Sequence, residues 1–214
     1  VNGQWEILLG RDFGVTLEWL RLLGVDAVLV NEKHSKELFH DYHTPEKFAG
    51  KLPVLYDDHA GNLIYEVPRR YRSLARVVDR RAFDALPSIP GNGDQASLGA
   101  WSAVLEQGPD APTTTEWKGT DELVVRAPVK AGQSVFVQVS YDTNWRAYSG
   151  ASRLPVRNTK TGLMLIDAPA GTQELRLLFP TPRSNQVGRV VTGLTILLSA
   201  ALLFQFRRPS KVSA

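Results

Sequence analysis

A chain of 214 residues with 43% hydrophobic and 22% charged residues can bury a sizeable core and has the composition of a folded globular protein. Its net charge of +3 does not indicate the clustered basic face that nucleic-acid binding normally requires, so we expect no nucleic-acid partner. Because the chain has no cysteine, disulfide frameworks, cysteine-ligated zinc sites and cysteine nucleophiles are excluded.

The first region, residues 1–85, is predicted to be a small α/β layer. It begins at Val1 without the charged and apolar parts of a secretory signal, so we interpret the chain as starting inside a longer gene product. Leucines recur at helical spacing between Thr16, a candidate N-cap, and Gly24, which has the position of a C′ glycine. A second helix is predicted to start near Ser35, and the predicted strands are DAVLV, LPVLYDD, NLIYEVP and SLARVVD.

Two polar clusters in this region are candidate chemical sites. His34, His40 and His43 lie within ten residues, and the i, i+3 pair among them could meet on one helix face and bind zinc. Their spacing matches no standard zinc motif, and a solvated helix end explains them as well, so we expect neither a metal nor a cofactor. Asp57 and Asp58 are adjacent on a predicted strand and would point to opposite faces, which favours a turn over a catalytic pair.

A run of basic residues closes the first region. Arg69, Arg70 and Arg72 could face anionic lipid head groups or a phosphate-bearing polymer. The alternative is a solvated run of charges with no binding role.

Residues 86–112 are predicted to be a linker, because LPSIPGNGDQ combines prolines, glycines and an Asn-Gly pair. The following ASLGAWSAVLEQ could add a short helix. From Thr113 the hydrophobic period changes to two, and short strands alternate with Gly, Pro and Asn joints. This pattern predicts an antiparallel β-sandwich over residues 113–182.

Aromatic residues in this sandwich could either stack on sugar rings or fill the core. On a strand that starts at Trp145, this side chain and Ala147 share one face, whereas Arg146 and Tyr148 share the other. We expect Trp145 to be buried, and we take Tyr148 and Arg146 as candidate contacts for a glycan or partner. Trp117 offers the same choice between core and contact.

The chain ends in an apolar run that is predicted to be a transmembrane helix at 187–206, followed by a cytoplasmic tail at 207–214. The run from Val190 to Phe206 has no formal charge, and its length matches a bilayer core of about 30 Å. A buried core helix is the alternative. The residues expected to flank the membrane are Arg189, Arg207, Arg208 and Lys211. This orientation places residues 1–186 outside the cytoplasm and the C-terminus inside.

The stretch VSYDTNWRAYSGASRLPVRNTKTGLMLIDAPAGTQELRLLFPTPRSNQVGRVVTGLTILL resembles the C-terminal end of bacterial YfhO-like membrane proteins, which are polytopic proteins of the GT-C glycosyltransferase type. That family has an aromatic Y-x-x-x-W-x-A-Y-x-G strand pair, then a D-A-P-x-G hairpin and a G-R entering the last membrane helix. The matching residues are Tyr141, Trp145, Tyr148, Gly150, Asp167, Pro169, Gly171, Phe179, Gly188 and Arg189. The resemblance implies that the catalytic acid and the lipid-phosphate donor site lie upstream of this chain, so no catalytic residue is carried over.

The expected fold class is therefore α+β: a small α/β layer, an antiparallel β-sandwich and a C-terminal transmembrane helix. The expected function is that of a non-catalytic extracytoplasmic C-terminal part of a membrane glycosyltransferase-like protein, which would take part in glycosylation of cell-envelope glycan or polymer. Its partners would be the lipid bilayer, the upstream membrane region of the same protein and cell-envelope glycan. The alternatives are a membrane-anchored module that binds glycan or protein without enzyme activity, and an independent enzyme that uses the histidine cluster.

Overall fold

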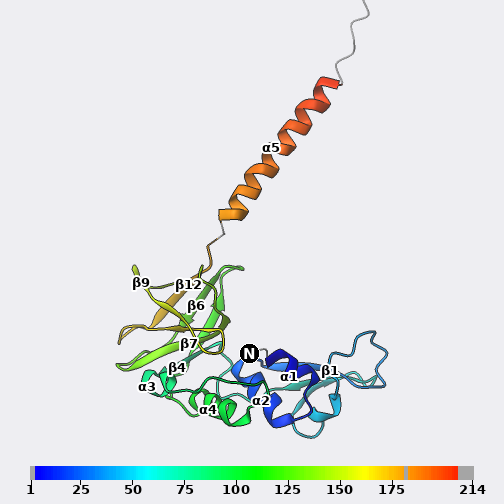
Figure 1. Ribbon diagram of the computed structural model, residues 1–214, viewed down its shortest axis with the longest axis vertical. Coiled ribbons are helices and arrows are strands. Elements are labelled where there is room, and N and C mark those ends of the chain that lie inside the picture. The colour runs from blue at the N-terminus through cyan, green and yellow to red at the C-terminus, as the bar shows by residue number, and fades with distance from the viewer. Residues whose placement is uncertain (1–2, 181–182, 207–214) are drawn as a thin grey trace, which may run out of the picture. The chain divides into compact units, whose positions relative to one another are not determined.

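The structure is a computed structural model that describes residues 3–180 and 183–206. The chain divides into two compact units, Val1–Leu178 and Phe179–Ala214. The first unit is an α+β fold with antiparallel sheets (Figure 1). Its helices are α1 (Gly3–Leu9), α2 (Phe13–Leu22), the 3-10 helix η1 (Pro45–Phe48), α3 (Arg80–Asp84) and α4 (Gln95–Glu106).

The strands of the first unit form three sheets, and each pair within a sheet is antiparallel. Sheet A has the order β1 (Ala27–Asn31), β3 (Asn62–Glu66), β2 (Val54–Asp57). Sheet B has the order β10 (Val156–Asn158), β11 (Leu163–Ile166), β7 (Gln133–Ser140), β4 (Ala75–Asp79). Sheet C has the order β5 (Thr114–Trp117), β6 (Glu122–Arg126), β12 (Glu174–Leu178), β8 (Arg146–Ser149), β9 (Ser152–Leu154).

Sheet B is buried on both faces. In β7 the side chains of Val135 and Val137 share one face and Phe136 takes the other, as expected for a strand, and all three are fully buried. Phe136 packs against Phe83 of α3 and Trp101 of α4, with ring centroids 5.2 and 6.3 Å away. Sheet C and helices α3 and α4 lie on opposite sides of sheet B in Figure 1. The valine face therefore belongs to the β-sandwich, and the phenylalanine face belongs to a second core beneath the helices.

Two of the regions predicted from the sequence, residues 1–85 and 113–182, contribute strands to the same sheet, sheet B. Strand β4 comes from residues 1–85 and pairs with β7 of residues 113–182, from Ala75 opposite Val137 to Asp79 opposite Gln133. Helix α4, from residues 86–112, contributes buried side chains to the core of the first unit. That helix and most of the strands were predicted correctly as local elements, but β5 was missed, and the single strand expected at SRLPVRN is divided between β9 and β10 of different sheets.

Two details of the first region differ from prediction. Helix α2 is capped by Asp12, whose Oδ1 accepts a hydrogen bond from the Val15 amide at 2.9 Å, and not by Thr16. Gly24 has a φ of +76°, which confirms its role at the helix end. The helix expected from Ser35 is wrong, because the chain there is irregular and Ser35 is tied by its hydroxyl to Asn62 Oδ1 at 2.6 Å.

The second unit contains helix α5 (Arg183–Phe206), 24 residues long. Among the residues that the structure describes, no helix is both long and apolar enough to cross a membrane. The transmembrane helix expected at 187–206 is therefore wrong. Asn185 and Arg189 lie in the first half of α5, and the apolar part with described side chains is shorter than the ~20 residues a bilayer requires.

The buried ammonium of Lys47 ties η1 to the end of α1. Its Nζ donates hydrogen bonds to the carbonyl oxygens of Ile7 and Gly10, at 2.6 and 2.8 Å. Burial lowers the pKa of Lys47 to about 8, because the charged form loses its hydration.

Replacing Phe136 with alanine should lower the free energy of unfolding by about 3–5 kcal/mol, because it leaves a cavity between sheet B and the helices. The matched control is Phe39→Ala, since Phe39 is 76% exposed and Phe136 is 0% exposed. The control should change the free energy by less than about 0.5 kcal/mol. Urea denaturation measures both, and equal losses would contradict the assignment of Phe136 to the core.

The free energy of unfolding should rise by about 2 kcal/mol between pH 8 and pH 10, because unfolded Lys47 still binds a proton in this range and folded Lys47 does not. Burial also raises the pKa of Tyr42 to about 12, but that shift acts above pH 10 and lowers stability as pH increases. Denaturant titrations at each pH test the expectation. The variant Lys47→Met should abolish the rise, and an unchanged rise would show that another group causes it.

Candidate functional site

A concave pocket lies at one edge of the β-sandwich, where the chain crosses twice between the sheets. It crosses from β7 to β8 through residues 141–145, and from β9 to β10 at Pro155. The pocket has a volume of 450 Å³. The residues that line it are Tyr141, Thr143, Trp145, Arg153, Leu154, Pro155 and Val156.

The first crossing is a turn built by side-chain hydrogen bonds. Asp142 Oδ1 accepts from the Asn144 amide at 2.7 Å and from Asn144 Nδ2 at 2.9 Å. The Trp145 amide donates to the Asp142 carbonyl at 3.1 Å, and the Tyr141 amide donates to the Gly162 carbonyl at 2.8 Å. This arrangement confirms the turn expected at DTN and fixes both aromatic residues of the pocket.

Trp145 forms the apolar floor of the pocket, and its burial confirms the sequence-based prediction. It is 9% exposed and packs against Trp117, with ring centroids 6.3 Å apart and a tilt of 54°. Trp117 lies on edge strand β5 opposite buried Leu123, so it belongs to the inward row of sheet C although 43% of it is exposed.

Arg146 and Tyr148 lie on the outer face of sheet C, as predicted. Arg146 pairs with Leu178 of β12, and Tyr148 lies opposite both Arg176 of β12 and Arg153 of β9. The structure therefore separates the predicted contact residues: Trp117 packs beside the floor of the pocket, whereas Arg146 and Tyr148 lie outside it. Arg153 was missed from the sequence, where it is one charged residue among solvated neighbours.

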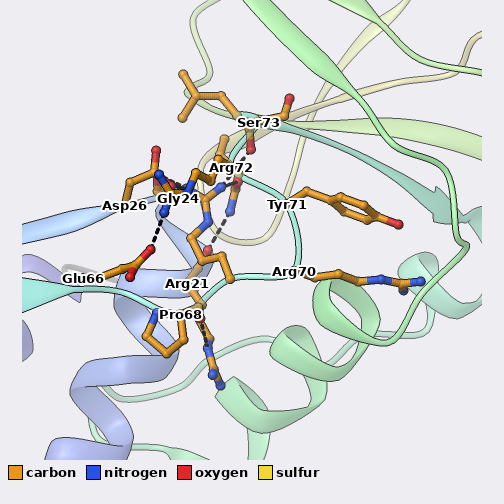
Figure 2. Close-up of polar contacts among 12 residues, drawn as sticks. Arg21, Gly24, Asp26, Glu66, Pro68, Arg70, Tyr71, Arg72 and Ser73 are labelled. Carbon is orange, nitrogen blue, oxygen red and sulfur yellow. Dashed lines mark hydrogen bonds and ion pairs between the residues drawn. The ribbon is translucent and has the colours of Figure 1, made fainter. Parts of the chain in front are cut away.

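The basic run at residues 69–72 forms a joint between the helices and the sheets (Figure 2). The side chain of Arg69 is fully buried, with an exposed fraction of 0%. Its Nη1 donates to Gly24 O and Asp26 Oδ1, both at 2.6 Å, and its Nη2 donates to Ser73 O at 2.8 Å and Gln138 Oε1 at 2.9 Å. This one guanidinium thus links the loop between α2 and β1 to Gln138 of β7 and to the segment that precedes β4.

A second buried guanidinium lies beside the first. Arg76 donates to Ser73 O at 2.6 Å, to Ala75 O at 2.9 Å and to Tyr71 O. Burial lowers the pKa of Arg76 to about 10, and the like charge of Arg69 lowers it further in the same direction. Both guanidinium groups donate their hydrogen bonds to backbone carbonyls, and Arg69 donates also to Asp26 and Gln138. These contacts indicate a structural role.

The other arginines of the run already have carboxylate partners. Arg70 pairs with Asp110 at 3.1 Å, and Arg72 pairs with Glu66. Figure 2 shows Arg70 and Tyr71 pointing away from the cluster around Ser73. The expectation of a solvated run is therefore wrong for Arg69, whose burial depends on tertiary neighbours and leaves no signal in the local sequence.

A third polar network centres on Asp167, which follows β11, and links it to β7, β10 and α3. Asp167 accepts hydrogen bonds from Ser134 at 2.8 Å and pairs with Arg157 at 2.8 Å and with Arg80 at 3.4 Å. Burial opposes ionisation of Asp167, but the Ser134 hydrogen bond and the Arg157 guanidinium outweigh it and lower its pKa. This aspartate of the D-A-P motif is thus engaged in cross-strand contacts.

The histidine candidates are exposed and lie on an irregular segment. His40 Nε2 is 3.1 Å from the Glu37 carbonyl, and His34 Nε2 is 3.6 Å from Glu32. Within the described residues, no group of three histidine or acidic side chains is arranged to hold a metal ion. His43 is also exposed.

The remaining predicted residues fall on the hairpin turn and on the end of the chain. Asp57 and Asp58 accept backbone hydrogen bonds from His59 and Ala60, both at 2.7 Å, which confirms the turn. Arg189 lies on α5. The positions Arg207, Arg208 and Lys211 lie outside the described residues.

No protein-family model, curated protein or solved structure matches the chain.

Replacing Arg69 with methionine should lower the free energy of unfolding by about 2–4 kcal/mol, because the buried carbonyl oxygens of Gly24 and Ser73 lose a charged donor. The matched control is Arg72→Met, since the Arg72 side chain is 77% exposed and forms a single surface ion pair. The control should cost less than about 1 kcal/mol. Chemical denaturation compares the two, and a mild effect of Arg69→Met would refute the joint.

Proposed function

We propose that the first unit is a non-catalytic carbohydrate-binding module whose ligand lies in the pocket at the sandwich edge. The observation that carries this proposal is the pocket itself, with its floor of Trp145, its wall of Tyr141 and its polar rim of Thr143 and Arg153. Its 450 Å³ falls within the volume range of small-molecule sites, and its lining exposes more polar than apolar surface, which suits a ligand rich in hydroxyl groups.

Aromatic rings suit a sugar ligand because a pyranose ring has an apolar face that stacks on them, while its hydroxyl groups bond to polar groups at the rim. The packing of Trp117 on Trp145 keeps the floor in place before a ligand binds. A preformed site loses less conformational entropy when it binds, which favours recognition of a flexible chain.

The non-catalytic part of the proposal rests on how the nearby polar groups are used. The residues that line the pocket include no aspartate, glutamate or histidine, and in the neighbouring turn Asp142 Oδ1 accepts two hydrogen bonds from Asn144. The Asp167 network is likewise satisfied by Ser134 and Arg157. A general acid or base needs a free position against the substrate.

The resemblance to the C-terminal end of YfhO-like proteins supports a glycan context, since those proteins are of the glycosyltransferase type. Under this proposal the module holds cell-envelope glycan for a catalytic region elsewhere in the protein. The matching residues Tyr141 and Trp145 are the ones that build the pocket.

Tyr141→Ala should weaken saccharide binding at least tenfold, because it removes one stacking surface of the pocket. The control is Tyr56→Ala on β2, where the tyrosine is 56% exposed and belongs to another sheet. An array of bacterial cell-envelope oligosaccharides identifies ligands of the unaltered protein, and calorimetric titration of those ligands compares the variants. Absence of any saccharide binding, or equal loss in both variants, would reject the proposal.

A further inference from the structure

We propose that the pocket selects anionic saccharides, and that Arg153 pairs with the acidic group of the sugar. This inference rests on the proposed carbohydrate function and adds the class of ligand. It is carried by the distribution of charge on the outer face of sheet C and by the place of Arg153 at the pocket.

Two arginines of sheet C are neutralised by carboxylates. Arg126 lies 3.5 Å from Glu116 and 3.3 Å from Glu174, and Arg176 lies 2.8 Å from Glu122. These pairs follow the cross-strand register of β5, β6 and β12. Their positive charge is therefore not available to a ligand without breaking an existing pair.

The two arginines at the β8–β9 end are different. Arg146 and Arg153 are exposed and, among the described residues, form no ion pair and no side-chain hydrogen bond. Asp142, exposed in the crossing turn, is the nearest acidic residue in the sequence, and its charge offsets only one of the two arginines. A local excess of positive charge thus lies beside the pocket.

Arg153 connects this excess to the site. It lines the pocket together with Tyr141 and Trp145. In the β8–β9 pairing it lies opposite Tyr148 on the edge strand β9, so it borders the pocket from the outer face of sheet C. A sugar ring stacked on the half-buried Tyr141, beside the nearly buried Trp145, would bring its substituents to the guanidinium at the rim. The planar guanidinium donates two parallel hydrogen bonds to a carboxylate or phosphate, which a neutral hydroxymethyl group cannot accept in the same way.

The charge can come from a uronic acid carboxylate or from a phosphate substituent, because the guanidinium recognises both. The experiment uses oligosaccharides of uronic acids, each beside its methyl-esterified form, and phosphorylated oligosaccharides beside their dephosphorylated forms. Inorganic phosphate alone is a further arm. Each pair has the same rings and linkages and differs only in charge, so calorimetric titration measures the contribution of charge.

The unaltered protein should bind the charged member of at least one pair tenfold or more tightly than the neutral member. Arg153→Gln should remove this preference, so that charged and neutral members bind equally, while it keeps the melting temperature. Arg126→Gln on the same sheet should keep the preference. Tyr141→Ala should weaken both members, which separates the ring contact from the charge contact.

The outcomes distinguish this inference from the proposed function. Equal binding of charged and neutral members would overturn the inference and leave a module for neutral glycans. A preference that survives in Arg153→Gln would overturn the assignment of this residue. Inorganic phosphate that binds as tightly as the charged saccharides would show an anion site without sugar recognition. If no member of any pair binds, both proposals fail.

Discussion

The pairing of β4 with β7 is the interaction on which the rest of the first unit depends. It inserts a strand of the N-terminal region into the central sheet of the sandwich, and it carries α3 and α4 onto the outer face of that sheet. Phe136 then becomes the centre of a second core, and Gln138 at the end of β7 reaches Arg69. Two segments far apart in the chain therefore stabilise one another, and a contact at this joint affects both cores.

Local elements could be predicted because their signals are local. The alternation in β7, the apolar face of α4 and the glycine at the end of α2 follow from periodicity and backbone conformation. The segment after Ser35 contains good helix formers, yet it is held as an irregular tether by the Ser35–Asn62 hydrogen bond and the packing of Tyr42 on Phe48. Tertiary contacts override propensity there, and no window of sequence contains them.

The site was predictable only in part, and for the same reason. The alternation of one strand is sufficient to place Trp145 inside and Tyr148 outside. It does not indicate that Trp117, on the far edge of sheet C, packs against Trp145, or that Arg153 lines one pocket with Trp145 at a crossing between sheets. Likewise the sequence does not distinguish Arg69 from Arg70, although one is buried among carbonyls and the other pairs with Asp110 at the surface.

At the pocket where the chain crosses between sheets, the residue that stabilises the fold differs from the residue proposed to recognise the ligand. The floor, Trp145, is part of the core, so its position is fixed by packing that the fold requires in any case. The rim residue Arg153 lies on the short edge strand β9 and has no side-chain partner among the described residues. Its replacement should therefore leave the stability of the core unchanged. Under the proposed function, such an arrangement would let the ring-stacking surface persist while the charge at the rim sets which saccharide is preferred. Specificity then depends on an electrostatic term that salt weakens, whereas the apolar contact beneath it does not depend on salt in this way.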